Sequence, residues 1–167
     1  MKAKKVAFLG LSIALAMILS FVEHKIPIPL YGSYGIKIGL PNLVMVFMLY
    51  RIGWKETVIV SIIRILLVSM LFGGLNPVAL ALSLAGAILS LTTMILLKKT
   101  GWFSCIPVSI KGGIIHNVGQ IIAAQWIMGT PEIVYYLPVL LISGIISGAI
   151  IGILAGMIVK RMEKWEF

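Results

Sequence analysis

One apolar stretch of this chain carries polar side chains of the kinds that bind ligands. The segment 109–128 is long enough to form a membrane-spanning helix, yet it contains five polar side chains. These are Lys111, His116, Asn117, Gln120 and Gln125. A polar group at mid-bilayer depth costs several kcal/mol unless it faces protein or water, so such groups usually line a binding site or a transport path. This stretch is the first candidate for the functional site.

Polar residues on the other apolar stretches could contribute to the same site. Glu23 ends the first stretch, Asn42 lies one turn into the second, and Arg64 lies near the middle of the third. Asn76 opens the fourth stretch. We expect these side chains to converge with the polar centre of residues 109–128 on a cavity in the outer half of a helix bundle.

Each of these residues also has a structural interpretation. Arg64 could pair with Glu23 or with helix carbonyls, and His116 could join two helices by a hydrogen bond. Asn117 and Gln120 are of the types that connect membrane helices. One ligand site accounts for the set more simply than unrelated structural contacts do, and it is the interpretation that we favour.

The residue types that are missing exclude several functions. The chain has no Asp, and none of its five Glu residues lies in the middle of an apolar stretch. Transport driven by protons or sodium usually needs a carboxylate within the membrane, and ATP hydrolysis needs a phosphate-binding loop, which this sequence lacks. The sequence has no ligand cluster at metal-binding spacing and no nucleophile near a base. We predict no enzyme activity, no metal, no cofactor and no energy source on this chain.

Composition indicates the class of protein. Of the 167 residues, 60% are hydrophobic and 11% are charged, whereas soluble domains carry roughly 25% charged residues. The net charge of +9 comes from basic residues placed between apolar stretches, a distribution that sets membrane orientation rather than binding nucleic acid. We predict a single all-α integral membrane domain, residues 1–167, in contact with lipid.

Six apolar stretches predict six transmembrane helices. They cover about residues 6–22, 38–50, 57–72, 77–97, 109–128 and 134–159. The second is short for a bilayer core and contains Pro41, so its length alone would also suit a re-entrant segment. Six crossings place most Lys and Arg residues on the side of the N-terminus, and the positive-inside rule then predicts that both termini are cytoplasmic.

The longest connection joins the first two stretches on the predicted outer side. Residues 24–36 contain Pro27 and Pro29, which favour extended backbone. A lid over the cavity and a plain connector both remain open for this segment. We expect Lys37, which follows it, to lie with Glu23 near the outer mouth of the site.

Two stretches carry small residues at regular spacing. The last one has glycines every four residues, at Gly144, Gly148, Gly152 and Gly156. The first has a weaker series, at Ala7, Gly10 and Ala14. Small residues at such spacing let another helix backbone come close. Both series could pack inside the bundle, and one of them, more plausibly the first, could instead dock a partner membrane subunit.

Several short motifs together resemble a known family. They are Glu23 with Ile26-Pro27-Ile28-Pro29, the run from Gly35 to Leu40 with Asn42, Arg64-Ile65-Leu66-Leu67, Ser83-Leu84-Ala85-Gly86, Leu89-Ser90, His116-Asn117-Val118-Gly119-Gln120 and Tyr135-Tyr136-Leu137-Pro138. The combination resembles a bacterial membrane family known both as heptaprenyl diphosphate synthase component I and as the Gx transporter family. It extends over nearly the whole chain. Pro41 departs from the pattern, since a small residue such as Ala is more usual there.

This family is similar to the substrate-binding S components of energy-coupling factor (ECF) transporters. The resemblance implies a six-helix, multi-pass protein of the bacterial cell membrane that captures a small molecule at an outward-facing site. It also implies a membrane T subunit and cytoplasmic ATPases as partners, with the Ala7, Gly10 and Ala14 face as the candidate T-subunit contact. The cation at Arg64 favours an anionic or polar-headed ligand, and isoprenoid-related molecules are among the candidates.

The other family name suggests a second hypothesis. Elongation of prenyl diphosphates uses Asp-rich motifs that hold magnesium ions, and a chain without Asp does not supply them. The second hypothesis is therefore a non-catalytic membrane partner or anchor of a polyprenyl diphosphate synthase. A stand-alone channel or exporter that assembles through the glycine series is a third, weaker one.

Overall fold

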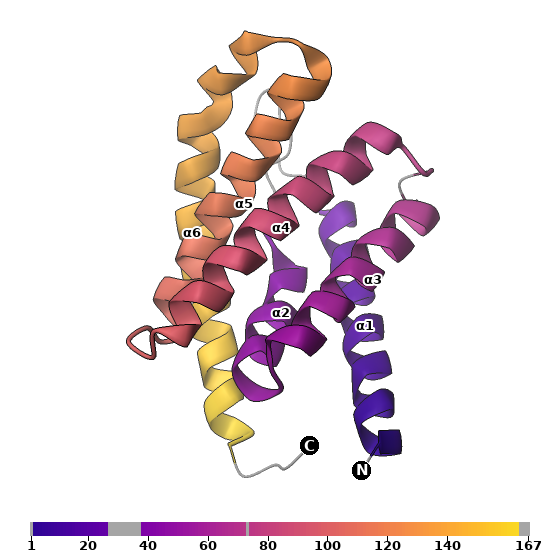
Figure 1. The fold of residues 1–167 in the computed structure, drawn as a ribbon, viewed down its shortest axis with the longest axis vertical. Helices are drawn as coiled ribbons and strands as arrows, with labels where there is room; N and C mark the ends of the chain where they lie inside the picture. Colours follow the sequence, from indigo (N-terminus) through magenta and orange to yellow (C-terminus); the bar gives the residue numbers. More distant parts are fainter. Residues whose placement is uncertain (1, 27–37, 73, 164–167) are drawn as a thin grey trace.

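The computed structural model describes residues 2–26, 38–72 and 74–163, which form six α-helices and one short 3₁₀-helix. The α-helices are α1 (Lys2–Lys25), α2 (Leu40–Arg51), α3 (Trp54–Phe72), α4 (Pro77–Lys99), α5 (Cys105–Met128) and α6 (Leu137–Arg161), and the 3₁₀-helix η1 (Pro131–Tyr136) precedes α6. Successive α-helices alternate in direction along the chain (Figure 1). The prediction of an all-α chain is confirmed for the described residues.

Three segments are long and apolar enough to cross a membrane. They are Ala3–Lys25 in α1, Pro77–Lys99 in α4 and Pro131–Arg161 in η1 and α6. Helix α2 has 12 residues, which gives about 18 Å at 1.5 Å per residue and is shorter than a bilayer core of about 30 Å. Helices α3 and α5 carry the polar residues that single out the candidate site. The structure therefore indicates a membrane protein with three segments of spanning character among the residues it describes.

The starts of α2 and α4 differ in how their N–H groups are satisfied. Asn76 caps α4, because its Oδ1 accepts hydrogen bonds from Val78 N at 2.9 Å and Ala79 N at 3.1 Å. Asn76 therefore acts as a helix cap, and it is not among the residues that line the cavity described below. Helix α2 starts after Gly39, which adopts a left-handed φ of 78° and provides no side-chain cap.

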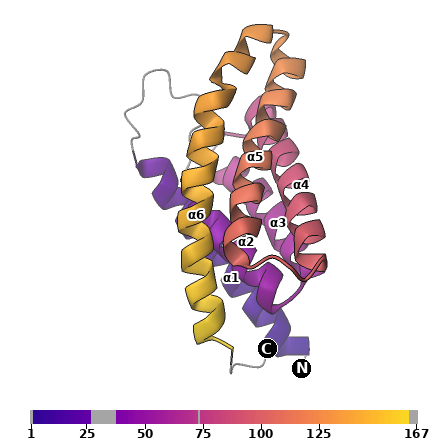
Figure 2. The same cartoon turned by 90° about the vertical axis from the view of Figure 1, so that its left-hand side faces the viewer.

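Helix α5 packs extensively on α4 and α6, which lie on either side of it, and α1 packs on α2 and α3 (Figures 1 and 2). Helix α2 also packs on α6, and α3 packs on α4, so the six helices form one bundle. Glycines permit the close approach of α5 and α6: a Cβ added at Gly113 would lie 2.6 Å from Gly144 O, and one added at Gly148 would lie 2.7 Å from Ile110 Cα. Gly152 is buried in the same contact, and Gly156 lies at its looser end.

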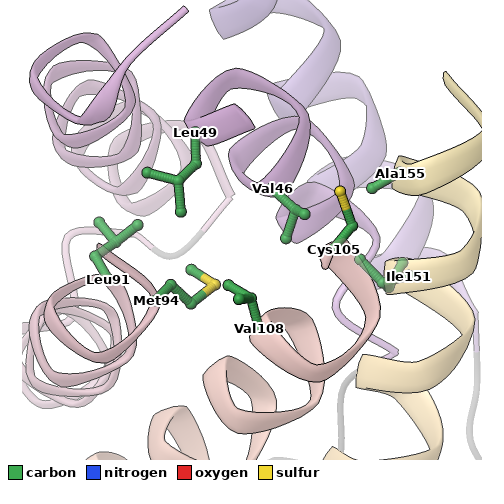
Figure 3. Close-up of a cluster of buried hydrophobic side chains, with 8 residues drawn as sticks. All are labelled: Val46, Leu49, Leu91, Met94, Cys105, Val108, Ile151 and Ala155. Atoms are coloured by element: carbon green, nitrogen blue, oxygen red, sulfur yellow. The ribbon is translucent and has the colours of Figure 1, made fainter. Parts of the chain in front are cut away.

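A dense apolar core occupies the end of the bundle where α1 begins and α6 ends (Figure 1). It combines side chains of α2, α4, α5 and α6, which point toward one another in Figure 3: Val46, Leu49, Leu91, Met94, Cys105, Val108, Ile151 and Ala155. Polar contacts tie the helix ends together beyond this core. Lys5 pairs with Glu56 between α1 and α3 at 2.5 Å, and Arg51 Nη2 donates to Met162 O at 2.8 Å.

The small-residue face of α1 is not covered by the rest of the described chain. Ala7, Gly10 and Ala14 are all exposed. A Cβ added at Gly10 would meet no atom within 4 Å. Among the described residues, Ala7, Gly10 and Ala14 therefore do not pack inside the bundle, which was one of the two interpretations of these small residues.

Candidate functional site

A cavity of about 470 Å³ lies within the helix bundle, toward the end opposite the dense core. All six helices contribute to its lining, and its volume is within the range of roughly 300–1,000 Å³ typical of small-molecule sites. Its lining includes six of the seven side chains singled out in the sequence as ligand contacts, namely Glu23, Asn42, Arg64, His116, Asn117 and Gln120. The seventh, Lys37, lies outside the described residues, as does most of the 24–36 connection.

Helical spacing explains the polar wall on α5. Gly113, His116, Asn117 and Gln120 follow the i, i+3, i+4, i+7 pattern of one helix face, and all four line the cavity. Gly112 and Gly119 lie on the neighbouring face, where they are buried against α4. His116, Asn117 and Gln120 therefore line the cavity, whereas Lys111 and Gln125, the other polar residues singled out on this stretch, do not.

Arg64 provides the positive charge of the cavity. Its Nη1 donates a long hydrogen bond of 3.4 Å to Ser20 Oγ on α1, and the carboxylate of Glu23 attracts it electrostatically. Its Nε is buried and has no hydrogen-bond acceptor among the described residues. A buried donor without an acceptor costs about 1–3 kcal/mol.

Glu23 joins two helices at the edge of the cavity. A carboxylate oxygen of Glu23, near the end of α1, accepts a hydrogen bond from the backbone N–H of Gly39, just before α2. Beside it, His24 and Ile26 are exposed and also line the cavity, as does Phe72 at the end of α3. The cavity therefore reaches the surface at this end of the bundle.

Asn117 has a structural contact as well as a place in the lining. Its Nδ2 donates a hydrogen bond of 2.6 Å to Leu140 O, which connects α5 to α6. This contact matches the interpretation of Asn117 as a connector of membrane helices. Its side-chain oxygen remains an acceptor that a ligand could use.

Gly86 on α4 sets the position of two cavity side chains and was not among the predicted site residues. A Cβ added at Gly86 would lie 2.9 Å from both Cε1 and O of His116 and 3.0 Å from Cγ of Gln120. Any side chain at this position would force His116, Gln120 or the helix backbone to shift. Gly86 stood in the sequence as part of the family-like motif, and nothing local distinguished it from the other glycines.

Serine hydroxyls in the lining were also missed. Ser20, Ser83 and Ser147 all line the cavity. Serines in membrane helices commonly bond to the carbonyl of the preceding turn, as Ser20 Oγ does by donating to Ala16 O at 2.8 Å. Serine alone therefore gives no signal of a site in the sequence.

The lining combines one guanidinium and one carboxylate, from Arg64 and Glu23, with other hydrogen-bonding groups. Carboxamides come from Asn42, Asn117 and Gln120, and imidazoles come from His24 and His116. Among the described residues, no group of three His, Cys, Asp or Glu side chains could hold a metal ion. The arrangement is suited to recognising a polar small molecule.

Comparison with known proteins gave one match. The chain matches the family model for heptaprenyl diphosphate synthase component I over residues 12–158, so the family suggested by the sequence motifs is confirmed. No curated protein matched, and no solved structure matched.

Proposed function

We propose, starting from the fact that the chain belongs to the heptaprenyl diphosphate synthase component I family, that it is the membrane substrate-binding subunit of an ECF-type importer. The observation that carries this proposal is the cavity, which is lined by polar side chains from all six helices. In this function the protein captures a small, anionic or polar-headed molecule and catalyses no reaction itself.

The distribution of charge supports an outward-facing site. Lys4, Lys5, Arg51, Lys55 and the basic pairs that end α4 and α6 all lie at the core end of the bundle. The positive-inside rule makes that end cytoplasmic in bacteria. Both termini are then cytoplasmic, all six helices cross or enter the membrane, and the cavity opens on the outer side.

The exposed face of α1 supports dependence on a partner. The sequence has no phosphate-binding loop and no mid-membrane carboxylate, so import needs energy from another chain. Ala7, Gly10 and Ala14 form a small-residue face that no described part of this chain covers. In the proposal this face contacts a membrane T subunit, which couples the protein to cytoplasmic ATPases.

The family name favours a second candidate function, that of a non-catalytic membrane partner of a polyprenyl diphosphate synthase. Such a partner would bind the enzyme through a surface of the bundle and would not itself catalyse chain elongation.

Co-purification from bacterial membranes separates the two functions. We expect tagged wild-type protein to retain a T subunit and two ATPases and to support ATP-dependent uptake. Gly10→Leu, which fills the exposed α1 face, should lose these partners but keep its bound small molecule. Arg64→Gln should keep the partners and lose the small molecule. Recovery of a soluble prenyltransferase without ATPases would overturn the import function and support the second one.

A further inference from the structure

We infer that the start of α3 and the end of α4 form a binding site for an anionic phospholipid. The headgroup phosphate contacts Lys55 and Lys99 beside Trp54, and the acyl chains lie along exposed surface of the two helices. None of these three residues lines the cavity, so the site is a separate one. It does not depend on the proposed import function, because it requires only that the chain lies in a membrane.

Two lysines from different helices meet at one tryptophan ring. Nζ of Lys55 and Nζ of Lys99 each lie 5.6 Å from the centroid of the Trp54 ring, a distance at which an aromatic ring attracts a cation. All three side chains are exposed, so a ligand can reach them from outside the bundle. Because lysine stems are flexible, both ammonium groups can contact the oxygens of a single phosphate.

The acidic residue that follows Lys55 along α3 is engaged elsewhere. This residue is Glu56, and its carboxylate accepts a hydrogen bond of 2.5 Å from Lys5 of α1. Neither Lys55 nor Lys99 forms an ion pair with another described residue. Two positive charges held near one ring repel each other, and an anion between them offsets that repulsion. The pair of lysines is thus suited to a negatively charged ligand.

Exposed and mainly apolar surface leads away from each lysine. The exposed residues are Ile59, Ile62 and Leu66 on α3 and Ile88, Thr92 and Leu96 on α4. Each series has the spacing of one helix face, and that face ends at Lys55 on α3 and at Lys99 on α4. Thr92 uses its hydroxyl within its own helix, because Oγ1 donates to Ile88 O at 2.8 Å. Both faces are therefore compatible with lipid acyl chains.

The two faces belong to neighbouring helices that run in opposite directions. Helix α3 packs on α4, and the start of α3 lies at the same end of the bundle as the end of α4 (Figure 1). This is the end of the dense apolar core, which the positive-inside rule places toward the cytoplasm. Basic residues next to the cytoplasmic membrane surface attract anionic lipid headgroups.

A phospholipid matches both parts of this surface. Its phosphate suits the paired lysines, and its acyl chains suit the apolar faces. Tryptophan is common at the membrane–water interface, where these two parts of a lipid meet. A small soluble anion would use the charges alone, and an acidic protein segment would leave the apolar faces without a partner. The surface therefore fits an anionic phospholipid best.

Fluorescence quenching by brominated lipids tests the site on the full-length protein. Trp54 is kept as the reporter, and the other three tryptophans, Trp102, Trp126 and Trp165, are replaced by Phe. The protein is placed in phosphatidylcholine vesicles that contain a minor fraction of brominated phosphatidylglycerol or brominated phosphatidylcholine. We expect stronger quenching by the anionic lipid. Lys55→Gln and Lys99→Gln should each lower this preference about fivefold, the effect of one basic residue near an anionic membrane surface.

Lys160→Gln is the matched control. Lys160 is an exposed cation at the same end of the bundle, but it belongs to the last turn of α6. Its replacement should leave the preference for the anionic lipid unchanged. If the reporter protein does not fold, native mass spectrometry of wild type and of the lysine variants measures the same preference from the lipids that each protein retains.

Four results would overturn the inference. The first is equal quenching by the two lipids, and the second is a loss of preference in Lys160→Gln as large as in Lys55→Gln and Lys99→Gln. The third is displacement of the lipid by soluble glycerol phosphate at constant ionic strength, which would assign the lysines to a free phosphate compound. The fourth is an unchanged lipid preference in both lysine variants together with loss of a co-purifying protein, which would assign the surface to a protein partner.

Discussion

Replacing Gly86 with Ala tests how the wall of the cavity is positioned. The added Cβ would lie 2.9 Å from Cε1 and O of His116 and 3.0 Å from Cγ of Gln120. Carbon atoms in contact prefer separations of about 3.5–4.0 Å, so the shortfall is at least about 0.6 Å. The two side chains can rotate away, but the carbonyl of His116 belongs to the backbone, and α4 and α5 must therefore separate slightly.

The expected cost in stability is small compared with the effect on the cavity. Overpacking of this kind costs about 1–3 kcal/mol, while Ala in place of Gly favours the helix by roughly 1 kcal/mol. The net loss is then about 0–2 kcal/mol. Displacement of His116 or Gln120 removes about one hydrogen bond to a ligand, worth 0.5–1.5 kcal/mol, or about a 2- to 12-fold loss of affinity. The Gly86→Ala variant should thus still fold, but it should bind its small-molecule ligand more weakly than wild type does.

Two glycine variants serve as controls for Gly86→Ala. Gly112→Ala overpacks the same contact between α4 and α5, because its Cβ would lie 2.6 Å from Sδ of Met94, but Gly112 does not line the cavity. Gly10→Ala meets no atom within 4 Å. The measurements are Tm in detergent and the amount of endogenous small molecule retained per protein, determined by mass spectrometry. Equal retention by Gly86→Ala and wild type, or equal losses in Gly86→Ala and Gly112→Ala, would refute this account of the wall.

Two further variants probe contacts that join helices. Asn117→Ala removes the hydrogen bond to Leu140 O and should lower the free energy of unfolding in detergent by about 0.6–1.7 kcal/mol. Gln125→Ala, on the same helix, should change that free energy little. Similar effects of the two substitutions would argue against the connecting role of Asn117. The hydrogen bond from Lys5 lowers the pKa of the Glu56 carboxyl, so the folded pKa lies below the unfolded one and the ion pair stabilises the protein at neutral pH. That stabilisation is about 0.5 kcal/mol, because the lysine of the pair is 54% exposed. It should disappear as the pH falls through the lowered pKa of Glu56. The Glu56→Gln variant should lack this part of the pH dependence of Tm.

Hydropathy predicted the helices well wherever helix limits depend on local sequence. Residues 77–97 were predicted as one helix, and α4 covers Pro77–Lys99, because proline suits a helix start and lysines suit its end. Residues 134–159 were predicted as one stretch, but Leu137 begins α6 after the 3₁₀-helix Pro131–Tyr136. The whole stretch is apolar, so hydropathy does not distinguish a 3₁₀ turn from an α-helix.

The predicted site residues were chosen by polarity in apolar surroundings. That criterion selected Arg64 and the α5 face because burying such groups is costly without partners. It also selected Asn76, which turned out to be a helix cap, since a cap and a site residue look alike before the helix start is known. The same criterion missed Gly86. Gly86 matters because a Cβ at this position would lie only 2.9 Å from His116.

The sequence by itself determined that this is an all-α membrane protein and which of its side chains are costly to bury, because both follow from residue type and periodicity along the chain. Tertiary structure alone decided how those side chains are used. It brought Glu23, Arg64 and His116 from three helices to one cavity and directed Asn117 toward Leu140. It also left the Gly10 face of α1 uncovered by the residues that the structure describes. These outcomes depend on distances between helices that are far apart in the chain, and such distances are set by packing rather than by any local pattern.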